Sequence, residues 1–134
     1  MQPQILVCDD EVHILRATEF KLRRAGYDVV TASDGEQAWE TIQARCPDLL
    51  ITDYQMPRLT GSELIQRLRA SDDTRDLPVI LLTGKEMELS REVVLEQWGV
   101  LAMLGKPFSP RELLQIVQNA VSVSGGESLE CSAL

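Results

Sequence analysis

The sequence predicts an α/β domain in which helices cover both faces of a parallel β-sheet. Short apolar runs rich in β-branched residues alternate with longer segments whose apolar residues recur every three or four positions. The chain has 134 residues, of which 44% are hydrophobic, so it can form one compact domain and has no room for a second. Strict alternation within a single domain is typical of repeated β-α units.

Five of the apolar runs are predicted to be strands, because each is short and several follow turn-forming segments such as those that contain Pro47 and Pro78. The predicted strands are Ile5 to Cys8, Tyr27 to Thr31, Leu49 to Thr52, Val79 to Leu82 and Val100 to Leu104.

Five segments with helical spacing of apolar residues follow these strands. Their boundaries carry typical signals, because Gly26 can end the first helix, Asp34 can cap the second, and Ser109 can cap the fifth. The predicted helices are Val12 to Ala25, Gly35 to Arg45, Ser62 to Ala70, Glu88 to Trp98 and Pro110 to Val121.

Five β-α units favour a flavodoxin-like (βα)5 fold, a doubly wound parallel five-stranded sheet with strand order 2-1-3-4-5. A closed eight-fold barrel would need about twice as many residues. We expect this domain to occupy residues 1–122. Residues 123–134 mix Gly, Ser and Glu with few large apolar side chains, which predicts a flexible tail or the stub of a linker to a missing output domain.

The charge and the cysteines limit the classes of partner. The formal net charge of -8 argues against direct binding to nucleic acid or to an anionic membrane face, and favours a cation as ligand. Three cysteines without a CxxC pair suit a reducing compartment. The sequence lacks a basic segment followed by an apolar one, and no apolar run approaches the roughly 18 residues of a membrane span, so we expect a cytoplasmic protein.

Reactive side chains follow four of the five predicted strands, at the edge where ligands bind in an open parallel sheet. Because these strand ends meet at one edge, the side chains are expected to share one crevice. The residues concerned are Asp9, Asp10 and Glu11 after the first strand, Asp53 after the third, Thr83 after the fourth and Lys106 after the fifth.

Clustered aspartates predict a bound cation, because the carboxylates would otherwise repel one another and raise the pKa of at least one of them. Oxygen ligands without a nearby histidine or thiolate favour Mg²⁺, or Mn²⁺, over zinc. The only histidine, His13, falls in the first turn of the first helix, where a solvated side chain is the simpler interpretation.

Beside such a cation an aspartate can attack phosphorus and form an aspartyl phosphate, while a lysine neutralises the transferring oxygens. Asp53 is the best placed nucleophile, since it follows the central strand. Each residue alone has a simpler interpretation: the acids after the first strand as helix N-terminal acids, Asp53 as a turn former, Thr83 as a strand-end hydroxyl and Lys106 as a loop lysine. Their joint placement favours the site.

The segments ILVCDDE, ITDYQMPRLTG, VILLTG and GKPF occur in this order. Over about residues 4 to 122 the chain resembles the receiver domain of two-component response regulators, of the chemotaxis-regulator kind. The resemblance implies phosphorelay signal transduction, in which Asp53 accepts phosphoryl from a phosphohistidine of a sensor histidine kinase or a histidine phosphotransfer protein. The receiver would catalyse its own phosphorylation and dephosphorylation without being a conventional enzyme, and would signal through a conformational change to a downstream protein partner or output domain.

The resemblance also assigns roles to individual residues. Asp10, Asp53 and the main-chain carbonyl of Gln55 would ligate Mg²⁺, and Asp9 would act largely through water. Thr83 and Lys106 would contact the phosphoryl group, and the peptide bond between Lys106 and Pro107 would be cis.

Three positions depart from the family pattern or are variable within it. Met103 stands where an aromatic residue usually changes rotamer with the threonine, so the usual coupling is in doubt. Lys85 and Gln55 stand two residues past Thr83 and Asp53, at positions that border the phosphoryl group and tune its hydrolysis. We expect an altered lifetime of the aspartyl phosphate.

Two alternatives belong to other classes. A phosphatase of the haloacid dehalogenase type also uses an aspartyl phosphate, but its DxDx(T/V) motif is missing here. A phosphorylation-independent, receiver-like protein-interaction module is the second, and Met103 is the only feature that favours it. The complete set of acidic residues, threonine and lysine argues against that module.

Overall fold

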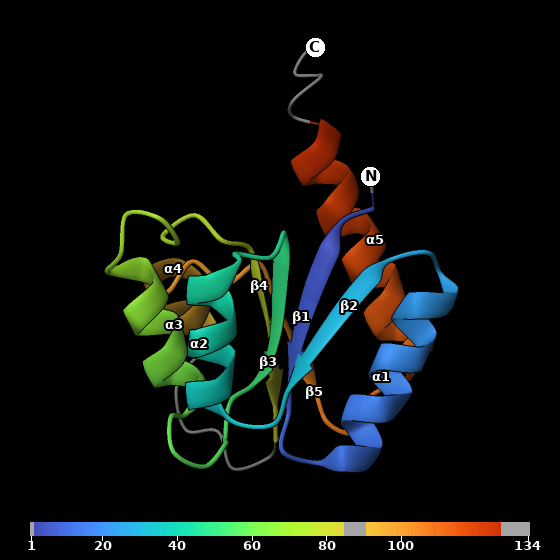
Figure 1. Cartoon of the computed structure of the whole chain (residues 1–134), viewed down its shortest axis with the longest axis horizontal. Coiled ribbons are helices and arrows are strands. Elements are labelled where there is room, and N and C mark those ends of the chain that lie inside the picture. The colour runs from blue at the N-terminus through green and yellow to red at the C-terminus, as the bar shows by residue number, and fades with distance from the viewer. Residues whose placement is uncertain (1, 85–90, 127–134) are drawn as a thin grey trace.

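The computed structural model describes residues 2–84 and 91–126. Its centre is a parallel five-stranded sheet with the order β2-β1-β3-β4-β5, which confirms the predicted fold (Figure 1). The strands are β1 (Gln4–Cys8), β2 (Asp28–Ala32), β3 (Leu49–Asp53), β4 (Val79–Thr83) and β5 (Ala102–Gly105).

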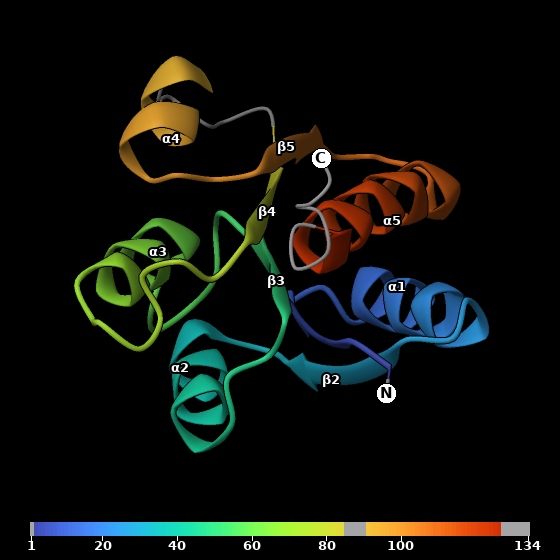
Figure 2. The same cartoon turned by 90° about the horizontal axis from the view of Figure 1, so that it is seen from above.

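Helices cover both faces of this sheet. Seen from above, α1 and α5 lie on one face, and α2, α3 and α4 lie on the other (Figure 2). The helices are α1 (Val12–Arg24), α2 (Gly35–Ala44), α3 (Gly61–Arg69), α4 (Arg91–Gln97) and α5 (Pro110–Gly126). No helix in the described part of the chain has both the length and the apolarity that a membrane crossing requires.

The sheet is buried on both faces, as a doubly wound fold requires. In β1, Ile5 and Val7 pack toward α1 and α5, whereas Leu6 and Cys8 pack toward the other three helices. All four side chains are completely buried. Burial of each large apolar side chain stabilises the fold by about 1.5–3 kcal/mol, so the sheet is a rigid support for residues at its edge.

Most helix boundaries follow the signals in the sequence. Asp34 accepts a hydrogen bond from the backbone N–H of Gln37 and caps α2, and Ser109 accepts one from Glu112 at the start of α5. Gly26 adopts a positive φ of 102° directly after the C-cap of α1. The N-cap of α3 is Thr60, which forms a capping box with Glu63, so this helix begins one residue before the predicted start.

Most other boundaries lie within two residues of the prediction, and the end of the fifth helix differs by five. Helix α5 continues to Gly126 and passes the predicted end at Val121, because residues 122–124 contain no proline and the first glycines stand at 125 and 126. The tail predicted for residues 123–134 therefore begins inside the helix, and residues 127–134 lie outside the described part. The predicted start of the fourth helix at Glu88 also lies outside it.

The loop that follows β3 is held against the sheet at two points. The Sγ atom of Cys8 lies 3.1 Å from the Sδ atom of Met56, and both side chains are buried. Gly61 lies so close to the backbone that a Cβ atom there would overlap the carbonyl oxygen of Asp53. These contacts fix the path of the chain beside Asp53.

Replacing Gly61 with Ala is expected to lower the free energy of unfolding by about 1–3 kcal/mol, because the methyl group would push α3 away from the end of β3. Urea denaturation measures this loss. Gly105→Ala is the matched control, since a methyl group at Gly105 would meet no heavy atom within 4 Å. Equal losses in the two variants would contradict the proposed overlap.

Candidate functional site

The four strands expected to carry the site do end at one edge of the sheet. Asp9 directly follows β1, Asp53 is the last residue of β3, Thr83 is the last residue of β4, and Lys106 directly follows β5. The backbone N–H of Lys106 donates to the carbonyl of Thr83 at 2.7 Å. The four strand ends therefore lie together at this edge.

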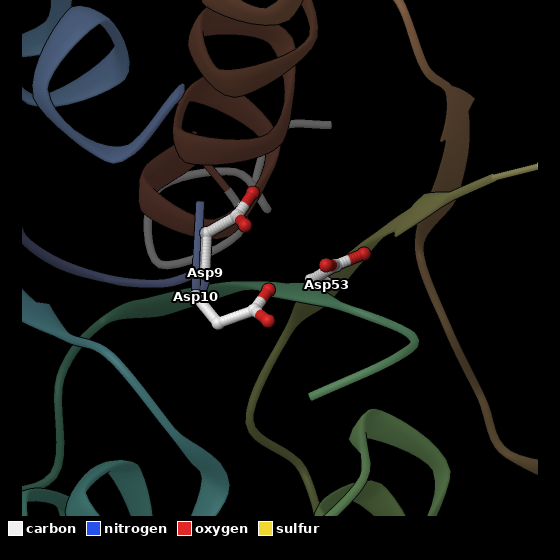
Figure 3. A group of neighbouring side chains, drawn as sticks. All are labelled: Asp9, Asp10 and Asp53. Atoms are coloured by element: carbon white, nitrogen blue, oxygen red, sulfur yellow. The ribbon is translucent and has the colours of Figure 1, made fainter. Parts of the chain in front are cut away.

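Three carboxylates meet at this edge, as Figure 3 shows. One oxygen each from Asp9, Asp10 and Asp53 lies within 4.8 Å of the others. Asp9 is completely buried, Asp53 is 6% exposed, and Asp10 is open to solvent. The cluster thus has a buried floor and one solvent-facing side from which a ligand can enter.

Asp9 is the most deeply buried member of this cluster. Its Oδ1 atom accepts a hydrogen bond of 2.9 Å from the backbone N–H of Glu11. Its Oδ2 atom lies 3.0 Å from the Nζ atom of Lys106, but among the described residues it has no partner in hydrogen-bond geometry. Burial raises the pKa of Asp9, although these two neighbours act in the opposite direction. An incompletely satisfied buried oxygen of this kind favours a cationic ligand.

Asp53 has a pKa raised from 3.8 to about 6, chiefly by burial and then by the charge of Asp9. The Nζ atom of Lys106, 3.1 Å from the Oδ2 atom of Asp53, opposes this rise. Repulsion between the aspartates was the predicted cause. It contributes, but removal from water is the larger effect.

Lys106 supplies the positive charge of the site. Burial alone would lower the pKa of its ammonium group, but the adjacent carboxylates of Glu11, Asp9 and Asp53 outweigh burial and raise it. The side chain is only 13% exposed, so its charge is held among the carboxylates. The peptide bond between Lys106 and Pro107 is cis, as expected.

Glu11 is a member of the site whose role the sequence does not predict. Its Oε1 atom lies 2.6 Å from the Nζ atom of Lys106, the shortest of the three carboxylate contacts of that ammonium group. The signal in the sequence was its place in the run of acids after the first strand. That run could not indicate which acid reaches a lysine 95 residues away.

The strand ends, the clustered carboxylates and the lysine are the arrangement that the sequence motifs implied. A family model described as the response regulator receiver domain matches residues 5–118. The chain belongs to this family.

The receiver domain is 41% identical over 113 residues to the alkaline phosphatase synthesis transcriptional regulatory protein PhoP of Bacillus subtilis (strain 168). This match covers 84% of this chain and 46% of PhoP. The chain spans less than half the length of PhoP and of two other transcriptional regulators that it matches.

Solved structures agree with this assignment. The receiver domain of the sensor histidine kinase PA1611 from Pseudomonas aeruginosa PAO1 superposes with a TM-score of 0.78 at 32% identity, covering 89% of this chain and 97% of that one. That structure has a magnesium ion coordinated in its active site cleft. The chemotaxis response regulator CheY4 of Vibrio cholerae gives a TM-score of 0.80 at 30% identity, covering 89% of this chain and 98% of that one.

The donor set of this receiver domain fits a hard divalent cation. All ligand atoms of the cluster are carboxylate oxygens, and one buried oxygen of Asp9 lacks a hydrogen-bond partner within the described residues. Such a set favours Mg²⁺ or Mn²⁺ over zinc, which prefers sulfur and nitrogen ligands. His13 is exposed on α1, as expected.

The remaining predicted residues of the receiver domain are placed, but their roles stay predictions. Thr83 is 9% exposed at the end of β4, and Gln55 is exposed in the loop after β3. Met103 is half-buried on β5 and packs against the core shared with α2, α3 and α4. Lys85 lies outside the described residues.

Proposed function

We propose that this receiver domain is a phosphorylation-dependent switch. Asp53 accepts a phosphoryl group from the phosphohistidine of a sensor histidine kinase or a histidine phosphotransfer protein. This proposal rests on the charged groups that surround Asp53. Its carboxylate lies 3.1 Å from the ammonium group of Lys106 and within 4.8 Å of the carboxylates of Asp9 and Asp10, at the end of the central strand.

The chemistry is a nucleophilic displacement at phosphorus. One carboxylate oxygen of Asp53 forms the new O–P bond, the N–P bond of the phosphohistidine breaks, and the electron pair leaves with the imidazole. Lys106 neutralises charge on the phosphoryl oxygens, and the hydroxyl of Thr83 donates a hydrogen bond to one of them. Attack by water at the phosphorus of the aspartyl phosphate breaks the O–P bond, releases inorganic phosphate and restores the carboxylate, so the domain acts only on itself.

Asp10, Asp53 and the carbonyl of Gln55 would hold Mg²⁺, or Mn²⁺ in its place, and Asp9 would act largely through water. When bound, the cation supplies positive charge that offsets the negative charge of the transferring phosphoryl group. The clustered carboxylates support this assignment, as does the buried Oδ2 atom of Asp9, which pairs with Lys106 but has no partner in hydrogen-bond geometry among the described residues.

The output is contact with a downstream protein partner or with an output domain, in the cytoplasm and without direct binding of nucleic acid by this domain. Relatives such as PhoP are named as transcriptional regulatory proteins, and the receiver domain matches less than half of PhoP. Phosphorylation would supply the free energy that biases the domain between two conformations.

Intact mass spectrometry after incubation with Mg²⁺ and acetyl phosphate tests the proposal. We expect the gain of one phosphoryl group, and no gain when Asp53 is replaced with Asn or when the metal is chelated. Asp72→Asn is the matched control, because its side chain is 92% exposed and lies outside the cluster.

Equal phosphorylation of Asp53→Asn and the wild type would contradict the proposal. If folded wild-type protein gains nothing from acetyl phosphate, the same measurement with phosphorylated sensor kinases decides whether a phosphohistidine donor is required.

A further inference from the structure

Glu11 occupies the N-cap position of α1 but does not cap the helix. Its backbone is extended, with φ of -89° and ψ of 106°, and its side chain makes no hydrogen bond to the first turn. The N-cap residues that accept a hydrogen bond from the first turn are usually Asp, Asn, Ser or Thr, so glutamate is not a preferred capping residue. Here the carboxylate extends instead to Lys106, across a separation of 95 residues.

Lys106 is therefore shared between two buried carboxylates and an exposed one. Its Nζ atom lies 3.0 Å from Asp9, 3.1 Å from Asp53 and 2.6 Å from Glu11. The side chain of Glu11 is 58% exposed, whereas those of the two aspartates are nearly inaccessible. Glu11 thus approaches Lys106 from the solvent side, from which an incoming phosphoryl group must also approach.

We propose that Glu11 is a positioning residue that holds Lys106 in the unphosphorylated receiver and competes with the phosphoryl anion for its ammonium group. This inference rests on the proposed function, because it assumes that Lys106 pairs with phosphoryl on Asp53. A phosphoryl group carries nearly two negative charges and three acceptor oxygens, and an ammonium group has only three hydrogens to donate. Because this ammonium group already faces Asp9, Asp53 and Glu11, the added phosphoryl oxygens compete with Glu11 for its hydrogens.

This competition lowers the affinity of the site for a phosphoryl anion and so opposes activation. The negative charge of Glu11 opposes an anionic ligand both by repulsion and by occupying Lys106. Removal of this charge frees the ammonium group for the ligand while leaving the carboxylate cluster of the aspartates intact. Beryllofluoride, an anion that mimics a phosphoryl group on a carboxylate, provides a probe that needs no kinase.

Glu11→Gln is expected to bind beryllofluoride about two- to five-fold more tightly than the wild type in saturating Mg²⁺, as measured by isothermal titration calorimetry. The difference should shrink in about 1 M salt, since one partner of the ion pair is exposed to solvent. A purely structural role for Glu11 would change the unfolding free energy without producing this salt-dependent gain in affinity.

Glu19→Gln is the matched control. It removes the same charge from α1, the helix that Glu11 precedes, but Glu19 pairs with Arg23 rather than with Lys106. Unchanged affinity in this variant, together with the gain in Glu11→Gln, supports the proposal. Equal or weaker affinity in Glu11→Gln overturns it.

A further comparison separates this inference from the proposed function. If wild-type protein does not bind beryllofluoride, or if Asp53→Asn binds it equally well, the proposed function fails and the role of Glu11 fails with it. If the wild type binds normally and Glu11→Gln does not differ from it, only the role of Glu11 is overturned.

Discussion

Replacing Lys106 with Met is expected to destabilise the metal-free receiver domain by about 3 kcal/mol at pH 8, because two buried carboxylates lose their counterion. Methionine keeps an apolar chain of similar length, so packing changes little. The loss should decrease toward pH 5, because Asp53, whose pKa is raised to about 6, becomes protonated there and no longer needs a positive partner. Urea denaturation at several pH values measures this dependence.

The stability of Lys106→Met in the presence of Mg²⁺ is a second measurement. A divalent cation among the aspartates replaces the missing positive charge, so saturating Mg²⁺ should restore much of the lost stability. Lys21→Met is the control, because it removes a lysine charge from the last turn of α1 and should cost less than about 1 kcal/mol at any pH. A loss in Lys106→Met that is independent of both pH and Mg²⁺ would contradict the electrostatic explanation.

The same variant tests the proposed chemistry. If Lys106 neutralises charge on the transferring phosphoryl group, phosphorylation of Asp53 by acetyl phosphate should be about 100-fold slower in Lys106→Met. The rates are measured at saturating Mg²⁺, where Lys106→Met should regain much of its stability, so that unfolding of the variant does not lower its rate. A rate within a factor of about two of the wild type would exclude this role for Lys106.

The sequence predicted the fold and the edge at which the site lies, because both depend on local patterns. Alternation of short apolar runs with amphipathic segments specifies the β-α units, and parallel strands must end at the same edge. Asp9, Asp53 and Lys106 could therefore be assigned to one crevice before any distance was known.

Features that depend on side-chain reach or on burial could not be predicted in this way. Glu11 lies next to Asp10 in the sequence, but only the three-dimensional arrangement shows that it contacts Lys106. The overlap that excludes a Cβ atom at Gly61 arises from how closely α3 approaches β3. Removal of Asp53 from water is likewise a property of the packed sheet. It raises the pKa of Asp53 more than does the repulsion between aspartates that the acidic motif predicted.

The raised pKa of Asp53 predicts that metal-free protein loses stability as the pH rises. Because the pKa is about 6 in the folded state and 3.8 ordinarily, the folded state binds the proton more tightly than the unfolded state does. This contribution is complete below pH 4 and is lost as the pH rises through 6, with a size of about 3 kcal/mol. Asp53→Asn should therefore be more stable than metal-free wild type at pH 7 and similar to it at pH 4, whereas Asp72→Asn should follow the wild type.

Mg²⁺ binding should show the same pKa through proton release. The cation requires ionised carboxylates, so at pH 5, where a group of pKa about 6 is mostly protonated, each bound Mg²⁺ should displace about 0.9 proton from Asp53. At pH 8 it should displace almost none, and the apparent affinity should fall close to ten-fold per pH unit below about 6. Isothermal titration calorimetry in buffers of different ionisation enthalpy measures the released protons directly. Equal affinity and no proton release across this range would mean that Asp53 is already ionised at pH 5, and that Lys106 outweighs burial at this site.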